Sequence, residues 1–538
     1  MSPARGGCRS MTFRRWTSTT RESSETVSSA CAASCGGRTS PWVYCPSRPR
    51  ARHRHAGPPR PWTTGCAVRV RRAAAGLEPA PLAPAGDRSG PRMRAPRALT
   101  CESYALFCDE YELTMAQSFW RHGQNNLAAF ELSVRHLPPH RGYLVVAGLE
   151  QVLALLASLH FDRGALAYLS STGTYDRGFL DFLGALRFTG HVDAIAEGTT
   201  AGADTPLLRI TAPRIEATVV ESAVLAIVNH QTSIATKAAR VVEAAQGRPV
   251  WDFSLRRVHG PEAGLAVARA AYIGGVVGTA TVVAGQRLGI PTTGTMAHHF
   301  VLLFGPDHEQ QAYEQFLRDY PERAALLIDT YDTVHAVDLA VAASRATGVA
   351  VTAVRLDSGD IVELSREVRR RFDAAGMPHV RILASGDLDE YRIRDLLARG
   401  ARVDSFGVGT MLGTSFDAPA LGGVLKLVAQ EQDGILEPVM KHSRDKLTDP
   451  GMHQVFRDDR GDVVALDDES LPGTPLLETV MTEGRARDLP ELDEMRRRTG
   501  AQVAALPERV RRFDDPEPWP VGRSGKLQAL RERMGASL

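Results

Sequence analysis

Two adjacent histidines, His298 and His299, follow a turn of small hydroxylated residues in the segment PTTGTMAHHF, residues 291–300. We expect residues 287–291 to form a strand that ends at this turn. Backbone N–H groups and hydroxyls in such a turn suit an anionic ligand. A histidine beside them can act as a base, a ligand or a nucleophile towards phosphorus. A polar turn with ordinary histidines is the alternative.

A cation and a carboxylate, Arg355 and Asp357, lie two positions apart at the end of a predicted strand. Residues two apart in a strand point to the same face, so these side chains leave on the same side. Such a pair can bind an anionic substrate, or hold a ribose hydroxyl or a metal-bound water. A structural ion pair is the alternative.

An aromatic ring stands close to two guanidiniums in DFSLRRVHG, residues 252–260. Phe253 with Arg256 and Arg257 would suit a flat aromatic acid together with a phosphate. A core phenylalanine followed by solvated arginines is the alternative. Together with the histidine, these segments describe a site for a planar anionic ring and a phosphorylated sugar.

Short apolar runs recur every 20 to 30 residues after about residue 250, with helical patterns between them. We expect strands at 326–328, 349–354, 380–384 and 403–408, and helices at 336–347, 361–375 and 388–399. This alternation predicts a parallel sheet, whose carboxyl edge is where ligands bind. Polar or glycine-rich residues follow all four runs, and two of these endings could close backbone amides on phosphate: Ser385–Gly386 in SGDL and Gly409–Thr410 in GVGT.

The preceding part of the chain mixes helices and strands without strict alternation, which favours an α+β domain. We expect helices at 110–120, 149–159 and 222–245, and strands at 130–134, 142–148, 207–211 and 216–220. Helical segments around 490–498 and 525–534 are expected to pack on this domain.

The first hundred residues differ from the rest in composition. They hold 18 arginines, no lysine and four acidic residues, a local charge of +14, which leaves −12 for residues 101–538 out of a total of +2. We interpret residues 1–98 as a disordered, non-functional extension, with Met93 as a better first residue. An organellar transit peptide and a nucleic-acid-binding arm are the alternatives.

The positions of the cysteines, the net charge and the lengths of the apolar runs exclude several classes of function. All seven cysteines lie in the first 108 residues, so the body has no disulfide framework, thiolate zinc site or cysteine nucleophile. Its acidic charge argues against nucleic-acid binding, and no apolar run is long enough for a membrane helix. We therefore expect a cytoplasmic protein.

Over roughly residues 105–460 the chain resembles the nicotinate phosphoribosyltransferase family. The order and spacing of many segments carry the resemblance: YELTMAQSFW, FELSVRHLPPHRGYLVVAGLE, NHQTSIATKAARVV, DFSLRRVHGPEAG, GTMAHHFV, LLIDTYDTV, VRLDSGD, LASGDL, FGVGTMLGTSFDAPALGGVLKLV and KHSRDKLTDPGMHQVFR. The resemblance implies a type II phosphoribosyltransferase fold, an irregular α/β barrel plus an α+β domain built from both chain ends. We expect the α+β domain at 99–245, the barrel at 246–430, and a C-terminal segment, 431–538, that packs back on the α+β domain.

The resemblance also implies an activity. The family condenses nicotinate with 5-phosphoribosyl 1-diphosphate to give nicotinate mononucleotide and diphosphate for NAD biosynthesis, and couples this to ATP hydrolysis through a phosphohistidine, with Mg²⁺. By motif, His298 is the phosphorylated residue, and Thr295 and Arg355 contact nicotinate. Tyr111 covers the pyridine ring opposite Phe253, from the second subunit of a homodimer. The resemblance implies that Asp357 faces the ribose or the metal. Further substrate contacts are implied for Arg256, Ser385, Gly386, Gly409 and Thr410. The metal ligands themselves are not assigned.

Two other enzymes and one non-enzyme remain as alternatives. Nicotinamide-specific relatives place an aspartate in a Gly-Thr-Asp-Thr run, where this chain has Ala280, which cannot accept the N–H of an amide. Quinolinate phosphoribosyltransferases need further cations for a second carboxylate and no histidine phosphorylation. A catalytically silent protein, tethered to nucleic acid by the basic leader, would form no product from nicotinate.

Overall fold

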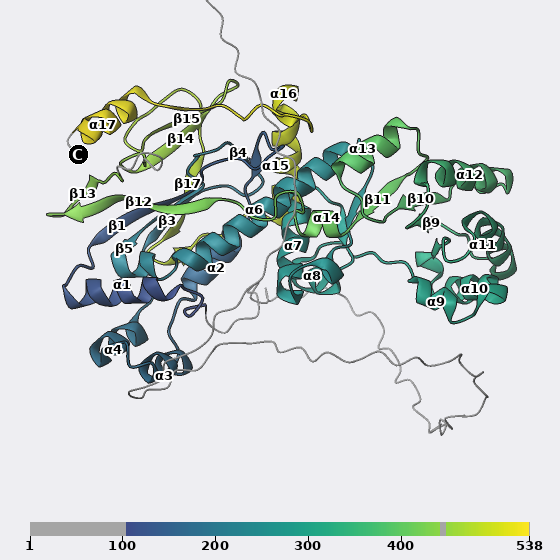
Figure 1. Ribbon diagram of the computed structural model, residues 1–538, viewed down its shortest axis with the longest axis horizontal. Coiled ribbons are helices and arrows are strands. Elements are labelled where there is room, and N and C mark those ends of the chain that lie inside the picture. The colour runs from purple at the N-terminus through teal and green to yellow at the C-terminus, as the bar shows by residue number, and fades with distance from the viewer. Residues whose placement is uncertain (1–103, 442–447, 537–538) are drawn as a thin grey trace, which may run out of the picture. The chain divides into compact units, whose positions relative to one another are not determined.

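The computed structural model describes residues 104–441 and 448–536, and the expected extension at 1–98 lies outside the described residues. Two large sheets organise the described chain (Figure 1). One is a curled, six-stranded parallel sheet, a half-barrel, and the other is a seven-stranded antiparallel sheet. The architecture is that of an α/β half-barrel with an α+β domain.

All six strands of the parallel sheet run in the same direction, so their carboxyl ends share one edge. In spatial order they are β7 (Gly278–Thr279), β6 (Val250–Asp252), β11 (Ser405–Val408), β10 (Arg381–Ala384), β9 (Ala353–Leu356) and β8 (Ala325–Leu327). The four strands expected from the apolar runs are β8 to β11, and they lie side by side in the sheet in their order along the chain.

The antiparallel sheet is built from both ends of the described chain. In spatial order its strands are β13 (Ile435–Pro438), β12 (Gly423–Gln432), β1 (Leu127–Val134), β5 (Leu208–Pro213), β3 (His191–Ile195), β17 (Leu477–Thr482) and β18 (Arg485–Ala486). β12 crosses the expected domain boundary at residue 430 and pairs with β1, while β17 pairs with β3. Two smaller sheets contain β16 (Thr474–Pro475), β14 (His453–Arg457), β15 (Asp462–Leu466) and β19 (Val521–Arg523), and β2 (Leu144–Val145) with β4 (Thr200–Ala201).

Helices connect and cover these strands. Those before the half-barrel are α1 (Glu110–Arg121), α2 (Leu149–Ala157), α3 (Arg163–Ser171), α4 (Arg177–Ala185), α5 (Arg214–Thr218) and α6 (Glu221–Ala244). Those of the half-barrel are α7 (Pro261–Ile273), α8 (Val282–Leu288), α9 (His298–Leu302), α10 (Glu309–Asp319), α11 (Thr333–Thr347), α12 (Ile361–Ala374), α13 (Glu390–Ala398) and α14 (Thr410–Gly413). The C-terminal helices are α15 (Leu492–Ala505), α16 (Glu508–Arg511) and α17 (Gly525–Ala536), and short 3-10 turns are η1 (Leu255–Arg257), η2 (Pro306–His308) and η3 (Pro321–Arg323).

The long helix α6 contributes to two hydrophobic cores. Its first half places Val224 and Val228 in the core under the antiparallel sheet, and its second half places Ile234 and Val241 in the core of the half-barrel. At 1.5 Å per residue its 24 residues extend about 36 Å, enough to reach both. The helix therefore fixes the half-barrel against the antiparallel sheet through buried apolar contacts.

Two strand predictions were wrong. Residues 287–291 do not form a strand: α8 extends to Leu288 and ends at Gly289, which has a left-handed backbone, and only a single bridge from Thr292 to Thr279 follows. Residues 216–220 were also predicted as a strand, but α5 occupies Arg214–Thr218. There Glu216 turns inward and accepts hydrogen bonds from the backbone N–H and hydroxyl of Thr189. Short apolar runs do not by themselves separate strands from helices.

Across 104–441 and 448–536, no helix is both long and apolar enough to cross a bilayer.

Candidate active site

The carboxyl edge of the parallel sheet gathers polar side chains from neighbouring strands. Asp329 follows β8, Asp357 follows β9 and Ser385 follows β10. The Asp329 carboxylate accepts hydrogen bonds from the backbone N–H of Asp357, at 2.9 Å, and from the Ser358 hydroxyl, at 2.7 Å. These bonds join the ends of β8 and β9, as expected when parallel strands end in register.

Arg355, Asp357 and Ser385 form a closed cluster. Arg355 Nη2 donates to Asp357 Oδ1 at 2.5 Å, Arg355 Nε donates to Ser385 Oγ at 2.8 Å, and Ser385 Oγ donates to the same Asp357 oxygen at 2.5 Å. Burial raises the pKa of Asp357, but the Ser385 hydrogen bond, Arg355 and nearby His298 outweigh it and hold the pKa below its ordinary value. The carboxylate is therefore anionic at neutral pH, and the Arg355 side chain, 11% exposed, is held in one orientation.

His298 belongs to the same site. It is the first residue of α9, where its Nδ1 lies 3.2 Å from Thr330 Oγ1 and its Nε2 lies 3.9 Å from Asp357 Oδ2. Its side chain is 40% exposed, so the imidazole is accessible to a ligand. The imidazole and the Arg355 guanidinium thus share one carboxylate, Asp357, and lie in a single site.

Phe253 forms a wall of the site beside the arginine. It follows β6, and the Arg355 guanidinium carbon lies 5.6 Å from the centroid of its ring. The ring occupies the space over Gly407 of β11, where an added Cβ would lie 2.4 Å from a ring carbon. Glycine at 407 is therefore what lets the ring pack against the sheet.

Glycine is also required in the turn after β10. Gly386 has φ +91°, and an added Cβ would lie 2.1 Å from the carbonyl oxygen of Asp357. This close approach holds the β9 and β10 endings together beneath the Arg355 cluster.

A buried carboxylate, Asp252, supports the opposite end of the site. It accepts hydrogen bonds from the backbone N–H of Ser254, at 2.9 Å, and from Thr279 Oγ1, at 2.7 Å. Burial raises the pKa of this carboxyl, and these hydrogen bonds reduce the rise. The Ala280 N–H donates to the Asp252 carbonyl, so the exposed Ala280 is fixed at the carboxyl edge beside β6.

The other predicted site residues make fewer contacts or are more exposed. Thr295 donates a hydrogen bond only to the carbonyl of Met296, at 3.2 Å, among its described contacts. Arg256 lies exposed in η1, and Gly409 precedes the single turn of α14, which begins at Thr410. Tyr111 is 47% exposed on α1, a helix that contacts α4 and α5 rather than the half-barrel strands. Within this chain Tyr111 is therefore not brought to the Arg355 cluster.

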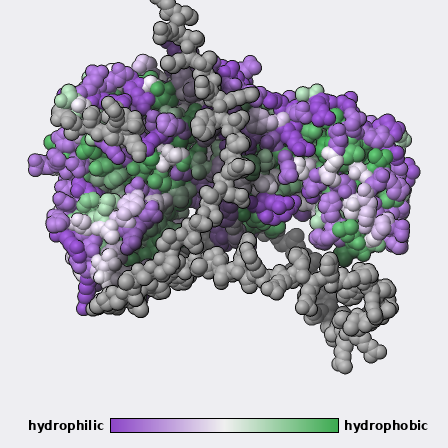
Figure 2. Space-filling view, in the orientation of Figure 1, coloured by the Kyte–Doolittle hydropathy of each residue, from purple (hydrophilic) through white to green (hydrophobic). Residues whose placement is uncertain are grey.

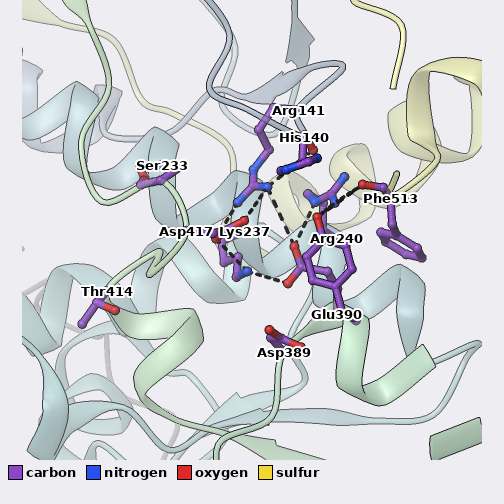
Figure 3. A network of polar contacts seen from close by, with 12 residues as sticks. His140, Arg141, Ser233, Lys237, Arg240, Asp389, Glu390, Thr414, Asp417 and Phe513 are labelled. Atoms are coloured by element: carbon purple, nitrogen blue, oxygen red, sulfur yellow. Dashed lines mark hydrogen bonds and ion pairs between the residues drawn. The ribbon is translucent and has the colours of Figure 1, made fainter. Parts of the chain in front are cut away.

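A buried ionic network braces the two glycine-containing turns (Figure 3). Glu390 opens α13 after the 385–386 turn, and Asp417 follows α14 after the 409–410 turn. Lys237 of α6 bridges them, at 2.5 Å to Glu390 and 2.8 Å to Asp417. Arg240 binds Glu390 at 3.0 Å, and Arg141 binds Asp417 at 2.9 Å.

The network places three cations against two carboxylates, all but Asp417 almost fully buried. Burial raises the pKa of Asp417, but Arg141 and Lys237 outweigh it and hold the pKa far below its ordinary value. Because one cation binds both carboxylates, the two turns are held in a fixed relation by α6.

Sequence reasoning missed the supporting residues. Asp329 and Thr330 directly follow the apolar run at 326–328, but the sequence pattern assigns neither of them a role. In the structure Asp329 joins β8 to β9 and Thr330 contacts His298. Their position in register with Asp357 was the available signal. Asp252 and Lys237 carried no comparable signal, because their partners lie 27 and 180 positions away in the chain.

Comparisons with known proteins agree with this architecture. Residues 106–229 match the nicotinate phosphoribosyltransferase N-terminal domain, residues 249–469 match the nicotinate phosphoribosyltransferase family, and residues 460–531 match its C-terminal domain. The chain is 45% identical to the nicotinate phosphoribosyltransferase pncB2 of Mycobacterium tuberculosis, over 79% of this chain and 92% of that protein. It is 35% identical to the nicotinate phosphoribosyltransferase of Bacillus subtilis, over 80% and 96%.

Two solved structures share the fold. The human nicotinic acid phosphoribosyltransferase superposes with a TM-score of 0.70 at 27% identity, covering 79% of this chain and 99% of that one. The nicotinate-nucleotide pyrophosphorylase of Pyrococcus furiosus gives 0.61 at 25% identity, covering 75% and 96%. The half-barrel, the α+β domain and the site at the carboxyl edge together define a phosphoribosyltransferase of the type II architecture. The chain belongs to the nicotinate phosphoribosyltransferase family, and it is an enzyme.

Proposed function

We propose that this enzyme condenses nicotinate with 5-phosphoribosyl 1-diphosphate, giving nicotinate mononucleotide and diphosphate in NAD biosynthesis. The observation that carries the proposal is the grouping of Phe253, Arg355, Asp357 and His298 at one sheet edge. A ring, a guanidinium, a carboxylate and an imidazole are the groups needed for an aromatic acid, a ribose and a phosphoryl group. A cytoplasmic location fits a body without cysteine after residue 108.

Arg355 and Phe253 bind nicotinate in this proposal. The pyridine ring stacks on Phe253, and the carboxylate pairs with the guanidinium, with Thr295 as a further contact. A charged acceptor satisfies the arginine, whereas the neutral amide of nicotinamide would leave it less well paired. Ala280 at the same edge offers no carboxylate to an amide N–H, so the site selects the acid.

The phosphorylated sugar lies along the turns after β10 and β11. Gly386, Gly409 and Thr410 provide backbone N–H groups, Ser385 orients the arginine and carboxylate, and Arg256 approaches the phosphate from η1. Diphosphate leaves from a centre with oxocarbenium character, so positioning and charge neutralisation are the main contributions of the protein.

The acidic residues of this edge fit a magnesium ion. Among the described residues, no group of three or more His, Cys, Asp or Glu side chains forms a metal cage. Mg²⁺, however, commonly takes one or two carboxylates together with substrate phosphates. Within the described part of the chain Asp329 Oδ1 is buried without a hydrogen-bond partner, and Asp357 is anionic, so these two residues would hold the ion. When bound, the ion supplies positive charge to the leaving diphosphate.

His298 accepts the γ-phosphoryl group of ATP. When Nδ1 keeps its proton and donates a hydrogen bond to Thr330 Oγ1, the lone pair of Nε2 is free to attack phosphorus. The N–P bond forms as the bond from phosphorus to the leaving ADP breaks. The exposed imidazole allows this approach. The phosphoryl group then adds negative charge beside the sugar site, and its hydrolysis couples ATP to product formation.

A homodimer completes the site. Tyr111 is exposed and away from Phe253 of its own chain, and Leu106, Phe107 and Met115 beside it are exposed as well. An apolar patch of this kind is typical of an interface. Docked on a second copy, Tyr111 would cover the pyridine ring on the face opposite Phe253.

The decisive assay measures nucleotide formation from nicotinate, nicotinamide and quinolinate, each with and without ATP. Both the full chain and a truncation beginning at Met93 should use nicotinate with stimulation by ATP. Preference for nicotinamide or quinolinate would refute the substrate assignment. Salt-sensitive RNA or DNA binding that disappears on truncation, without any product, would instead favour the silent binding protein.

A further inference from the structure

A polar cavity lies at the amino edge of the parallel sheet, opposite the carboxyl-edge site described above. Its volume is about 1400 Å³, and six arginines line it: Arg248, Arg366, Arg369, Arg370, Arg381 and Arg402. Residues 101–538 carry a net charge of −12, so this concentration of guanidiniums is local. Figure 2 shows mainly hydrophilic residues where α12, the source of three of them, lies in Figure 1.

Three of the arginines come from three neighbouring strands. Arg248 precedes β6, Arg402 precedes β11 and Arg381 begins β10, and these strands are adjacent in the order β6, β11, β10. Neighbouring strands lie about 4.8 Å apart, so the three residues form a row along the sheet edge. We call these residues the arginine row.

The guanidiniums of the arginine row have few anionic partners. The α12 arginines are paired, Arg366 with Glu363, Arg369 with Asp373 and Arg370 with Glu367. Arg248, by contrast, donates only to backbone carbonyls among the described residues, chiefly to that of Val403 at 3.0 Å. Within the described part of the chain, the side chains of Arg381 and Arg402 have no hydrogen bond or ion pair.

The carboxylate nearest this row by sequence is already engaged. Asp404 lines the cavity, and its Oδ2 accepts the backbone N–H of Ile382 at 2.8 Å. Asp373, the other carboxylate that lines the cavity, is paired with Arg369. Within the described residues, three guanidiniums without carboxylate partners therefore lie beside two carboxylates that are already engaged. The cavity has an excess of positive charge and several free donors.

We propose that the arginine row binds a chain of condensed phosphates, either free or as the polyphosphate of a nucleotide. Guanidiniums spaced along an edge match an anion with several charged groups in line, and each can donate two hydrogen bonds to phosphate oxygens. Among the described residues no aromatic side chain lines the cavity, so they offer a base no ring on which to stack. Recognition thus rests on the phosphate chain, and it is separate from the catalytic edge.

The test is calorimetric titration of the full-length protein with sodium tripolyphosphate and, in a second arm, with ATP. The variant R381Q/R402Q removes two exposed guanidiniums of the row. The matched control, R318Q/R487Q, removes the same charge from exposed arginines of α10 and the loop after β18, both remote from the cavity in sequence and already paired with Glu314 and Glu478. Inorganic sulfate at equal ionic strength tests for a general anion effect.

The expected result is one binding equivalent fewer, or one site weakened about tenfold or more, in R381Q/R402Q but not in the control. Loss with tripolyphosphate as well as with ATP identifies the phosphate chain as sufficient, and tighter binding of ATP identifies a nucleotide as the preferred source. Loss with ATP alone would overturn the proposal, because recognition would then depend on the base or sugar. Unchanged binding in R381Q/R402Q would overturn the proposal, as would an equal loss in the control. Equal competition by sulfate would also overturn it, because the row would then be a non-selective anion surface.

Discussion

The guanidinium of Arg355 lies 5.6 Å from the centre of the Phe253 ring, while its Nη2 and Nε are bound to Asp357 and Ser385. Three strands, β6, β9 and β10, thus meet at one side chain. The arginine is placed beside an aromatic face, where a planar acid can meet both.

Replacing Arg355 by lysine tests this placement. The ammonium keeps the charge but loses the planar fork that binds two partners while lying beside a ring. We expect KM for nicotinate to rise roughly 10- to 100-fold, the equivalent of one or two charged hydrogen bonds. Steady-state kinetics measures this change in KM. Arg318→Lys, the same substitution at an exposed position of α10, is the control. An unchanged KM would mean that the arginine does not touch the acid.

Gly407→Ala tests the packing of Phe253. The added Cβ would lie 2.4 Å from the ring, so the ring must move or the strand must shift. We expect a loss of about 1–3 kcal/mol in the free energy of unfolding, together with weaker nicotinate binding. Gly522→Ala, in β19 with its nearest neighbour at 3.8 Å, is the matched control. Equal, small effects in both variants would contradict the assigned contact.

Glu221 at the start of α6 provides a pH test. Burial, followed by the Glu112 and Asp109 carboxylates, raises the pKa of Glu221 from 4.5 to about 7. A folded-state pKa above the unfolded value means that the folded protein binds the proton more tightly, so stability falls as pH rises from about 4.5 to about 7. Glu221→Gln removes this loss.

Urea denaturation of Glu221→Gln at about pH 5 and about pH 8 measures the effect. Relative to wild type, the variant should gain stability at the higher pH. Glu322→Gln, an exposed substitution, should show no such gain. A stability difference between Glu221→Gln and wild type that is the same at both pH values would refute the assignment.

Lys237→Met tests the network that braces the two turns. It leaves Glu390 with reduced compensation in a buried setting, and breaking such a pair costs about 3–5 kcal/mol. Lys526→Met removes an exposed partner of Asp468 and should cost about 1 kcal/mol or less. Chemical denaturation of both variants provides the comparison, and similar losses would show that the network is not a brace.

The parallel sheet and the site at its carboxyl edge could be predicted because their signals are local. Asp357 and Ser385 each follow an apolar run directly, and the parallel arrangement then brings them to one edge. The strand expected at 287–291 failed because its middle residue, Gly289, is the left-handed residue that ends the preceding helix α8. The stretch from Thr292 to Thr295 is consequently a loop beside β7 rather than the continuation of a strand.

Long-range partners could not be predicted in this way. The pairing of β1 with β12, the Lys237 network and the arginine row depend on residues far apart in sequence. Nothing in the pattern around Arg381 or Arg402 distinguishes them from ordinary surface arginines. Their adjacency follows only from the strand order β6, β11, β10.

The most direct test of the account is phosphoryl transfer to His298 itself. Incubation with ATP labelled at the γ-phosphate should place one acid-labile phosphoryl group on each chain, and nicotinate with 5-phosphoribosyl 1-diphosphate should discharge it. His298→Ala should take up no label and lose ATP-stimulated turnover, whereas His299→Ala, at the neighbouring exposed position, should retain both. Full labelling and full ATP coupling in His298→Ala would contradict the central claim.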